Sequence, residues 1–289
     1  MAVDSTGPMM LPVGGGIELC VEAIGRPTDD AILLIAGATW SMDWWEDELC
    51  RTLAGGGRLV VRYDQRDTGQ SSSCPPGSPD YTGTDLVTDA VRVLDGLGIA
   101  RAHLVGLSMG GGIAQALALD HRDRLASLTL MSTSPIDPGI EGLPGPTPQL
   151  AATFAEQRST PDWRDRDAVV DYIIEGERPY AGPRLFDEAR LRAIAGRVVD
   201  RSRDMAASLT NHFLIDQGGP ADASLSRLDG LRTLVLHGTA DPLFPPAHGR
   251  ALAKAIAGAR LIELDGVGHQ VPPPPTWDRL VEALVQHTC

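Results

Sequence analysis

The sequence predicts a single α/β fold in which a mostly parallel central sheet is flanked by helices and carries an inserted helical lid. Short aliphatic runs alternate with helix-like segments, and a parallel sheet buries such runs on both faces. A serine stands in a sharp turn between one of these runs and a helix-like segment. Between residues 135 and 226 the alternation gives way to Pro/Gly-rich and then Arg-rich sequence, which predicts the lid.

This pattern divides the chain into a core, residues 1–134 and 227–289, and a lid, residues 135–226. The strands expected in the core are, in order, 17–24, 31–36, 58–63, 103–107, 127–131, 233–237 and 259–264. A helix is expected after Thr84 and Asp85, whose side chains can cap it, and another over 247–257. The lid is expected to hold helices near 149–157, 166–175 and 187–203.

The pentapeptide Gly106-Leu107-Ser108-Met109-Gly110 lies where the apolar run 102–105 meets the helix-like segment 111–119. A serine at such a junction is forced into a sharp turn with its hydroxyl at the rim of the sheet, and the glycines give the turn room. An ordinary turn serine is the simpler interpretation of a five-residue pattern. The strand before it and the helix after it favour a nucleophile elbow, so Ser108 is the candidate nucleophile.

The C-terminal quarter supplies a carboxylate and then a histidine, which is the order that this arrangement needs. Asp241 lies in a loop just beyond the buried strand 233–237, and His269 follows the strand 259–264. We predict that His269 is the base and Asp241 the acid that orients it. Asp137, which follows an earlier strand, is the alternative acid. The other histidines, of which His237 is the nearest rival, fit strand, loop or surface positions.

Attack of a serine on a carbonyl carbon creates an oxyanion, and backbone amides must already face it. The amide of Met109, directly after the nucleophile, is one candidate donor. The amide of Ala38, in the loop after the strand 31–36, is the other.

Aromatic residues near this loop are candidates for the substrate pocket. Trp40, Trp44 and Trp45 follow the loop and suit a flat aromatic ligand, although tryptophans are also common in cores. Trp40 and the loop residue Gly37 are the substrate-binding candidates. In the lid, the candidates for either lid core or pocket wall are Phe154, Trp163, Tyr172, Phe186, Met205 and Phe213.

These motifs resemble those of the α/β-hydrolases, and among them the aclacinomycin methylesterase group of polyketide-tailoring esterases. The resemblance covers residues 32–45, 61–71, 89–131 and 233–269. It implies the α/β-hydrolase fold and a serine hydrolase with a Ser-His-Asp triad. Such an enzyme cleaves a carboxylic ester, for example a methyl ester of an aromatic polyketide, through an acyl-enzyme.

The sequence also departs from this family pattern. Ala38 stands where glycine is usual, so its methyl group narrows the pocket, and Asp67 stands where many relatives have glycine. The lid matches the family only loosely. The identity of the acyl group and of the alcohol therefore does not follow from the resemblance.

Other functions stay open. Thioesterase, lactonase and perhydrolase reactions use the same acyl-enzyme. A hydrolase-fold protein that binds a small ligand without turnover is a further alternative, but an intact set of Ser108, Asp241 and His269 favours an enzyme. Epoxide or haloalkane opening needs a carboxylate nucleophile, and the serine at 108 counts against it.

Composition agrees with a single soluble enzyme, and the partner that we expect is a small-molecule ester substrate. The chain has 289 residues and a net charge of −13, which argues against nucleic acid and anionic membranes as partners. The four cysteines show no metal-ligand spacing and no disulfide framework. No apolar stretch is long enough for a membrane helix, and the segment Met1–Pro8 lacks the features of a signal peptide. We expect a cytoplasmic, cofactor-free protein that is a monomer or a small homo-oligomer.

Overall fold

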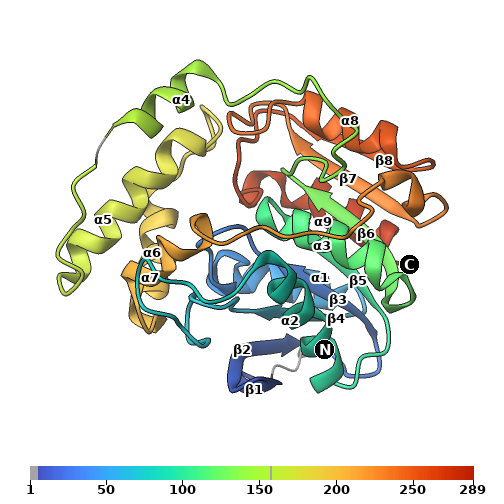
Figure 1. Cartoon of the computed structure of the whole chain (residues 1–289), viewed down its shortest axis with the longest axis horizontal. Coiled ribbons are helices and arrows are strands. Elements are labelled where there is room, and N and C mark those ends of the chain that lie inside the picture. Colours follow the sequence, from blue (N-terminus) through green and yellow to red (C-terminus); the bar gives the residue numbers. More distant parts are fainter. Residues whose placement is uncertain (1–5, 157) are drawn as a thin grey trace.

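The computed structural model describes residues 6–156 and 158–289 and shows an eight-stranded sheet with strand order β1-β2-β4-β3-β5-β6-β7-β8 (Figure 1). The pairs β1/β2 and β2/β4 are antiparallel, and the remaining pairs are parallel. The strands are β1 (Met9–Gly14), β2 (Ile17–Ile24), β3 (Asp30–Ile35), β4 (Arg58–Tyr63), β5 (Ala102–Leu107), β6 (Leu125–Met131), β7 (Thr233–Gly238) and β8 (Arg260–Leu264). The predicted mostly parallel α/β fold is confirmed. The predicted core includes residues 1–5 and the predicted lid includes residue 157, and these residues lie outside the described part of the chain.

Helices cover both faces of the sheet. Successive side chains of a strand point to opposite faces, and in these strands the side chains on both faces are aliphatic. In β3, Leu33 and Ile35 join one buried cluster with α2 (Gly83–Gly96), α3 (Met109–Asp120) and α8 (Ala247–Ala255). Ile32 and Leu34 join the other cluster with α1 (Asp47–Gly55) and α9 (Trp277–His287). Every predicted strand lies within two residues of an observed one.

Two local predictions need correction. The sequence interpretation omitted β1, an edge strand that pairs with β2 alone and contains Pro12, a residue that argues against a strand. Helix α2 begins before Thr84, because Thr82 is its N-cap. The Thr82 side chain accepts from the amide of Asp85, and the Asp85 carboxylate accepts from the amide of Thr82, which is a capping box.

A helical insertion connects β6 to β7. It contains α4 (Pro148–Ala155), α5 (Arg166–Glu177), α6 (Glu188–Arg201) and α7 (Met205–Ser208). Figure 1 shows these helices together on the left of the view, next to the sheet. Helices α5 and α6 bury Val170, Ile174 and Ile194 in the second cluster, so the insertion is packed onto the core. Within residues 6–156 and 158–289, no helix has the length and apolarity needed to cross a membrane.

Candidate active site

The turn at Ser108 places a side chain at the end of β5 and the start of α3. Ser108 has φ 54° and ψ −120°, a conformation that L-residues rarely adopt. Its amide donates to the carbonyl of Met131 on β6 at 3.0 Å, and its carbonyl accepts from the Thr133 hydroxyl at 2.8 Å. The backbone is thus held on both sides of the strained residue, as a nucleophile elbow requires.

The two glycines of the pentapeptide allow three elements to meet closely under this turn. A Cβ added at Gly106 would lie 2.2 Å from the carbonyl oxygen of Gly110. A Cβ added at Gly110 would lie 2.3 Å from the carbonyl oxygen of Ile35 at the end of β3. Both distances are shorter than any normal contact, so β3, β5 and α3 approach one another only with glycine at both positions.

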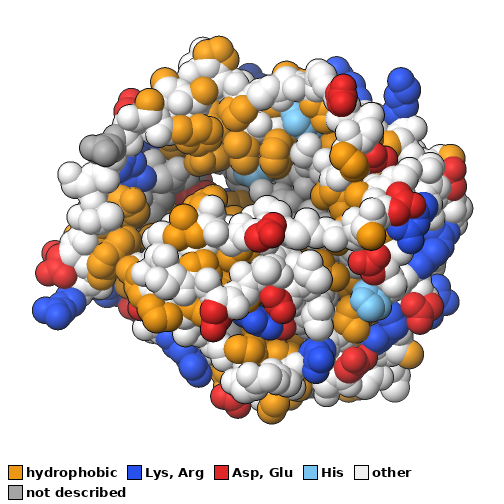
Figure 2. Space-filling view, in the orientation of Figure 1, with side chains coloured by type: hydrophobic (Ala, Val, Ile, Leu, Met, Phe, Trp, Pro, Cys, Tyr) orange, Lys and Arg blue, Asp and Glu red, His pale blue; other side chains and the backbone are white. Residues whose placement is uncertain are grey.

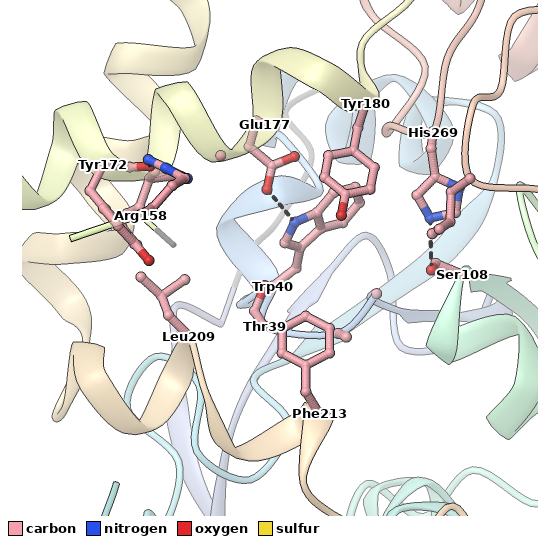
Figure 3. A pocket seen from close by; sticks show the side chains of 15 residues that line it. Thr39, Trp40, Ser108, Arg158, Tyr172, Glu177, Tyr180, Leu209, Phe213 and His269 are labelled. Carbon is pink, nitrogen blue, oxygen red and sulfur yellow. Dashed lines mark hydrogen bonds between the residues drawn. The ribbon is translucent and has the colours of Figure 1, made fainter. Parts of the chain in front are cut away.

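Ser108, His269 and Asp241 form a continuous series of hydrogen bonds. Ser108 Oγ lies 2.8 Å from His269 Nε2 (Figure 3), and His269 Nδ1 lies 3.0 Å from Asp241 Oδ2. The other carboxylate oxygen of Asp241 accepts from the amides of Leu243 and Phe244 at 3.0 and 2.9 Å. All of these hydrogen bonds form when Nδ1 carries the imidazole proton, because Nε2 can then accept from the serine hydroxyl.

The rival residues make other hydrogen bonds, although His237 Nε2 also lies 3.8 Å from Asp241 Oδ2. Both carboxylate oxygens of Asp137 accept from backbone amides, those of Gly139 and Leu225, so this residue holds a turn. His237 is buried in β7, its Nε2 lies 2.7 Å from the carbonyl oxygen of Phe244, and burial lowers its pKa. His237 therefore supports the loop that follows Asp241.

The loop after β3 lies against the elbow. A Cβ added at Gly37 would be 3.4 Å from Cβ of Ser108 and 3.3 Å from the ring of Trp40. Ala38, the candidate oxyanion donor in this loop, lines a cavity beside Ser108. Met109, the other candidate, lines a second cavity beside the same serine.

His212, in the insertion, holds this loop in place, which sequence reasoning did not anticipate. Its ring is buried, Nδ1 accepts from the amide of Thr39 at 2.9 Å, and Nε2 lies 2.8 Å from the carbonyl oxygen of Arg66. Burial lowers the pKa of His212, which favours the neutral form. Neutral imidazole with its proton on Nε2 satisfies both bonds. Thr39 itself has φ 67°, so the histidine stabilises a strained position.

Two cavities meet at Ser108. The smaller, about 250 Å³, is lined from the core by Gly37, Ala38, Thr39, Trp40, Leu243 and His269, and from the insertion by Arg158, Tyr172, Ile173, Gly176, Glu177, Tyr180, Leu209 and Phe213. The larger, about 580 Å³, is bordered by α3, by the segment 133–138 and by the loop 217–220. Figure 2 shows a hollow on one face of the molecule with hydrophobic side chains around it. Among the described residues, no cluster of His, Cys, Asp and Glu could hold a metal ion.

Some of the aromatic candidates line the smaller cavity, and the others do not. Trp40 lines the smaller cavity, Trp44 stacks on it with ring centroids 4.8 Å apart, and Trp45 is buried in the core. In the insertion, Tyr172 and Phe213 line the same cavity. The remaining lid candidates do not line it: Phe154 is exposed, Trp163 packs edge-on against Tyr172, Phe186 lies under Arg178, and Met205 is buried.

Known proteins resemble this chain in sequence and in fold. A family model described as alpha/beta hydrolase fold matches residues 30–272. Rhodomycin D methylesterase DnrP of Streptomyces peucetius is 32% identical, with 97% of this chain and 98% of that protein covered. Rhodomycin D methylesterase DauP of Streptomyces sp. (strain C5) is 33% identical, with 94% and 95% covered. The crystal structure of esterase RhEst1 from Rhodococcus sp. ECU1013 superposes with a TM-score of 0.74 at 21% identity, covering 98% of each chain, a likeness of fold alone.

Proposed function

Because the chain belongs to the α/β-hydrolase family, as the sequence motifs indicated, we propose that it is a serine esterase that cleaves a carboxylic ester through an acyl-enzyme. The hydrogen-bonded chain from Ser108 through His269 to Asp241, at the junction of two cavities, carries this proposal. The similarity to two methylesterases supports an ester-hydrolase role.

The proposed reaction follows from the positions of the protons. As Ser108 Oγ attacks the ester carbonyl, His269 Nε2 takes the hydroxyl proton, and Asp241 Oδ2 stabilises the imidazolium through Nδ1. The imidazolium then gives its proton to the alkoxide oxygen, the C–O bond breaks, and the alcohol leaves. Water, deprotonated by the same Nε2, attacks the acyl-enzyme and releases the acid and free Ser108.

The oxyanion of each tetrahedral intermediate needs donors that are already in place. We assign the amides of Met109 and Ala38 to this role, since they line the two cavities on either side of Ser108. Each such donor contributes roughly 3 to 4 kcal/mol to the stability of the transition state. The His212 bond to Thr39 fixes the peptide next to Ala38.

A methyl ester of a planar aromatic polyketide is the substrate that we propose. The Trp40 ring, stacked on Trp44, offers a flat wall in the smaller cavity, and Tyr172 and Phe213 add aromatic surface from the insertion. Stacking on such rings contributes about 1 kcal/mol for each ring beyond area burial. We further propose that residues 135–226 act as a lid over the core formed by 1–134 and 227–289, because the insertion supplies much of this cavity's wall.

The nucleophile is tested by Ser108→Ala. This variant should stay folded and lose ester hydrolysis by several orders of magnitude, and a fluorophosphonate should label only the wild-type protein. Labelling of the variant at the same rate would place the nucleophile elsewhere. If the wild type turns over no ester but binds aromatic esters, the protein is a hydrolase-fold binding protein instead.

The substrate class is tested by comparing kcat/KM for an anthracycline-type methyl ester with that for p-nitrophenyl octanoate, after correction for the better nitrophenolate leaving group. The aromatic ester should be favoured, and Trp40→Ala should weaken its turnover selectively. Ready hydrolysis of alkyl esters with no turnover of any aromatic methyl ester would leave only the general esterase function.

A further inference from the structure

Glu177 places a carboxylate in the smaller cavity, beside the groups proposed to carry the reaction. It ends α5, and its Oε1 accepts a hydrogen bond from Trp40 Nε1 at 3.0 Å (Figure 3). Tyr180 stands between Glu177 and His269 in this view. Within the described chain, this indole N–H is the one hydrogen-bond donor to the Glu177 carboxylate, and no Lys or Arg pairs with it.

The cations that line the same cavities as Glu177 bind other groups. Arg158, at the cavity wall, lies over the ring of Tyr172 at 4.2 Å from its centroid and donates to the Tyr172 carbonyl at 2.8 Å. Arg190, in the adjoining small cavity behind Glu177, pairs with Glu46. The Glu177 carboxylate is thus half-buried and has no counter-charge of its own among the described residues.

Burial raises the pKa of Glu177 to about 7, and the hydrogen bond from Trp40 and the nearby His269 only partly offset that effect. Glu177 is therefore easier to protonate than an exposed glutamate. A cation entering the cavity would favour the ionised form and would gain an ion pair with a half-buried carboxylate.

We propose that Glu177 makes this cavity a binding site for a protonated or quaternary amine carried by the ester substrate. The inference rests on the proposed ester hydrolysis at Ser108. The rings of Trp40, Tyr172, Tyr180 and Phe213 line the same cavity, and aromatic faces attract an ammonium group. A carboxylate together with aromatic walls solvates a cation better than an alkyl group, and Arg158, which also lines the cavity, lies over the Tyr172 ring.

A substitution can remove the charge of Glu177 and keep its hydrogen bond with Trp40. Glu177→Gln keeps a carbonyl oxygen that can accept from the indole N–H, but it removes the negative charge. Glu175→Gln is the matched control, because Glu175 is exposed, pairs with Arg178 and does not line the cavity.

The probes are pairs of esters that differ only in their terminal group, trimethylammonium in one and tert-butyl in the other, on alkyl spacers of increasing length. The wild type should show a higher kcat/KM for the charged ester at one or more spacer lengths. Glu177→Gln should lower this charged-to-neutral ratio about tenfold, or about 1.4 kcal/mol. Glu175→Gln should leave the ratio unchanged.

The pH profile of the wild type gives a second readout should the variant fail to fold. Because the quaternary ammonium does not titrate, the ratio should rise as the pH increases through about 7 and Glu177 ionises. Both esters need the unprotonated Nε2 of His269 for turnover, so this requirement is common to the two. The guanidinium groups at this cavity and the adjoining one are those of Arg158 and Arg190, and burial raises the pKa of Tyr180 above its ordinary value.

A ratio near one at every spacer length and pH, or an unchanged ratio in Glu177→Gln, would overturn the amine site. Binding of the charged ester to Ser108→Ala, followed by tryptophan fluorescence, keeps this result separate from the proposed function. Loss of that binding in Ser108→Ala/Glu177→Gln supports the site even if the wild type hydrolyses neither ester. Equal binding by the two variants excludes it.

Discussion

Asp241 binds His269 through one carboxylate oxygen and two backbone amides through the other. In Asp241→Asn the amide oxygen can still accept from Leu243 and Phe244, but an NH₂ group then faces Nδ1. The imidazole is left in the wrong tautomer, so Nε2 no longer accepts from Ser108. We expect kcat for ester hydrolysis to fall by roughly 10⁴ with little loss of stability.

Asp137→Asn is the control, because Asp137 holds a turn through Gly139 and Leu225. Its kcat should be near that of the wild type, although its midpoint of thermal unfolding can fall. Steady-state kinetics on one p-nitrophenyl ester compares the two variants. Inactivation of Asp137→Asn beside an active Asp241→Asn would transfer the role of the acid to the earlier strand.

His212 acts on the site through the loop at Thr39. Asparagine places a carbonyl oxygen near the position of Nδ1, so His212→Asn can keep the bond to the Thr39 amide, whereas the longer glutamine reaches the position of Nε2 and loses it. A released loop misplaces the Ala38 amide. His212→Gln should therefore lower kcat roughly 10- to 100-fold, and His212→Asn distinctly less.

This comparison separates loop positioning from general support of the fold. Thermal unfolding of both variants should show similar losses, since each removes one buried hydrogen bond. The KM for a small ester should change less than kcat. Equal kcat losses in the two variants would contradict a role for the Thr39 bond.

The residues that sequence reasoning identified differ from those it missed by their place in the chain. Ser108, Asp241 and His269 each follow a strand of the sheet, so their positions could be inferred from hydrophobic runs alone. His212 and Glu177 lie in the insertion, where polar helical sequence looks like solvated surface. Their contacts with Thr39 and Trp40 span 173 and 137 residues, and no local pattern indicates such pairs.

At the scale of elements, hydrogen bonds attach the insertion to the loops that carry the site. His212 binds the loop after β3, and the carbonyl oxygen of Tyr180 accepts from the amide of His269 at 2.8 Å. A Cβ added at Gly268 would lie 2.2 Å from that same carbonyl oxygen, so the approach requires glycine there. The walls of the smaller cavity therefore keep their position relative to the histidine.

Two exposed phenylalanines of the insertion test its part in substrate selection. Phe213 is 71% exposed and lines the smaller cavity, whereas Phe154 is 55% exposed and does not. Phe213→Ala should alter the ratio of kcat/KM between bulky aromatic and small alkyl esters several-fold, because it removes one wall from the bulky ester. Phe154→Ala should leave this ratio unchanged.

Neither substitution should change stability by more than about 0.5 kcal/mol, since both side chains are largely in water. Reaction with a small fluorophosphonate provides the reference, because it needs the nucleophile but little of the cavity. If Phe213→Ala slows every substrate and the phosphonate equally, the insertion supports the fold of the site and does not select substrates.

Element boundaries show why prediction of the fold succeeded unevenly. The aliphatic runs of β3, β5 and β7 are buried on both faces, so composition alone identifies them. Strand β1 is an edge strand with alternating exposure and an internal proline, which hides the periodic signal. The cap at Thr82 was missed because Thr84 and Asp85 offer the same side-chain chemistry two and three residues later.

At the scale of the whole molecule, two buried histidines on the core elements couple stability to pH. His103 Nδ1 lies 2.8 Å from the Ser127 hydroxyl between β5 and β6, and His287 Nε2 lies 3.1 Å from the carbonyl oxygen of Leu128. Burial lowers the pKa of each to about 4 from 6.5. Both therefore stay neutral in the folded protein at pH values where the unfolded chain would protonate them.

Because these folded-state pKa values are depressed, the unfolded state binds more protons than the folded state below about pH 6.5. The free energy of unfolding therefore decreases as the pH falls from about 6.5 toward about 4. A shift of this size in one histidine corresponds to roughly 3 kcal/mol.

His103→Asn/His287→Gln keeps a polar atom near each bonded nitrogen and removes both titrating groups. Chemical denaturation at several pH values between 7 and 4 should therefore give a smaller loss of unfolding free energy for the double variant than for the wild type. Carboxylates elsewhere contribute equally to both proteins and cancel from the difference. Parallel curves for the two proteins would show that these histidines do not couple folding to pH.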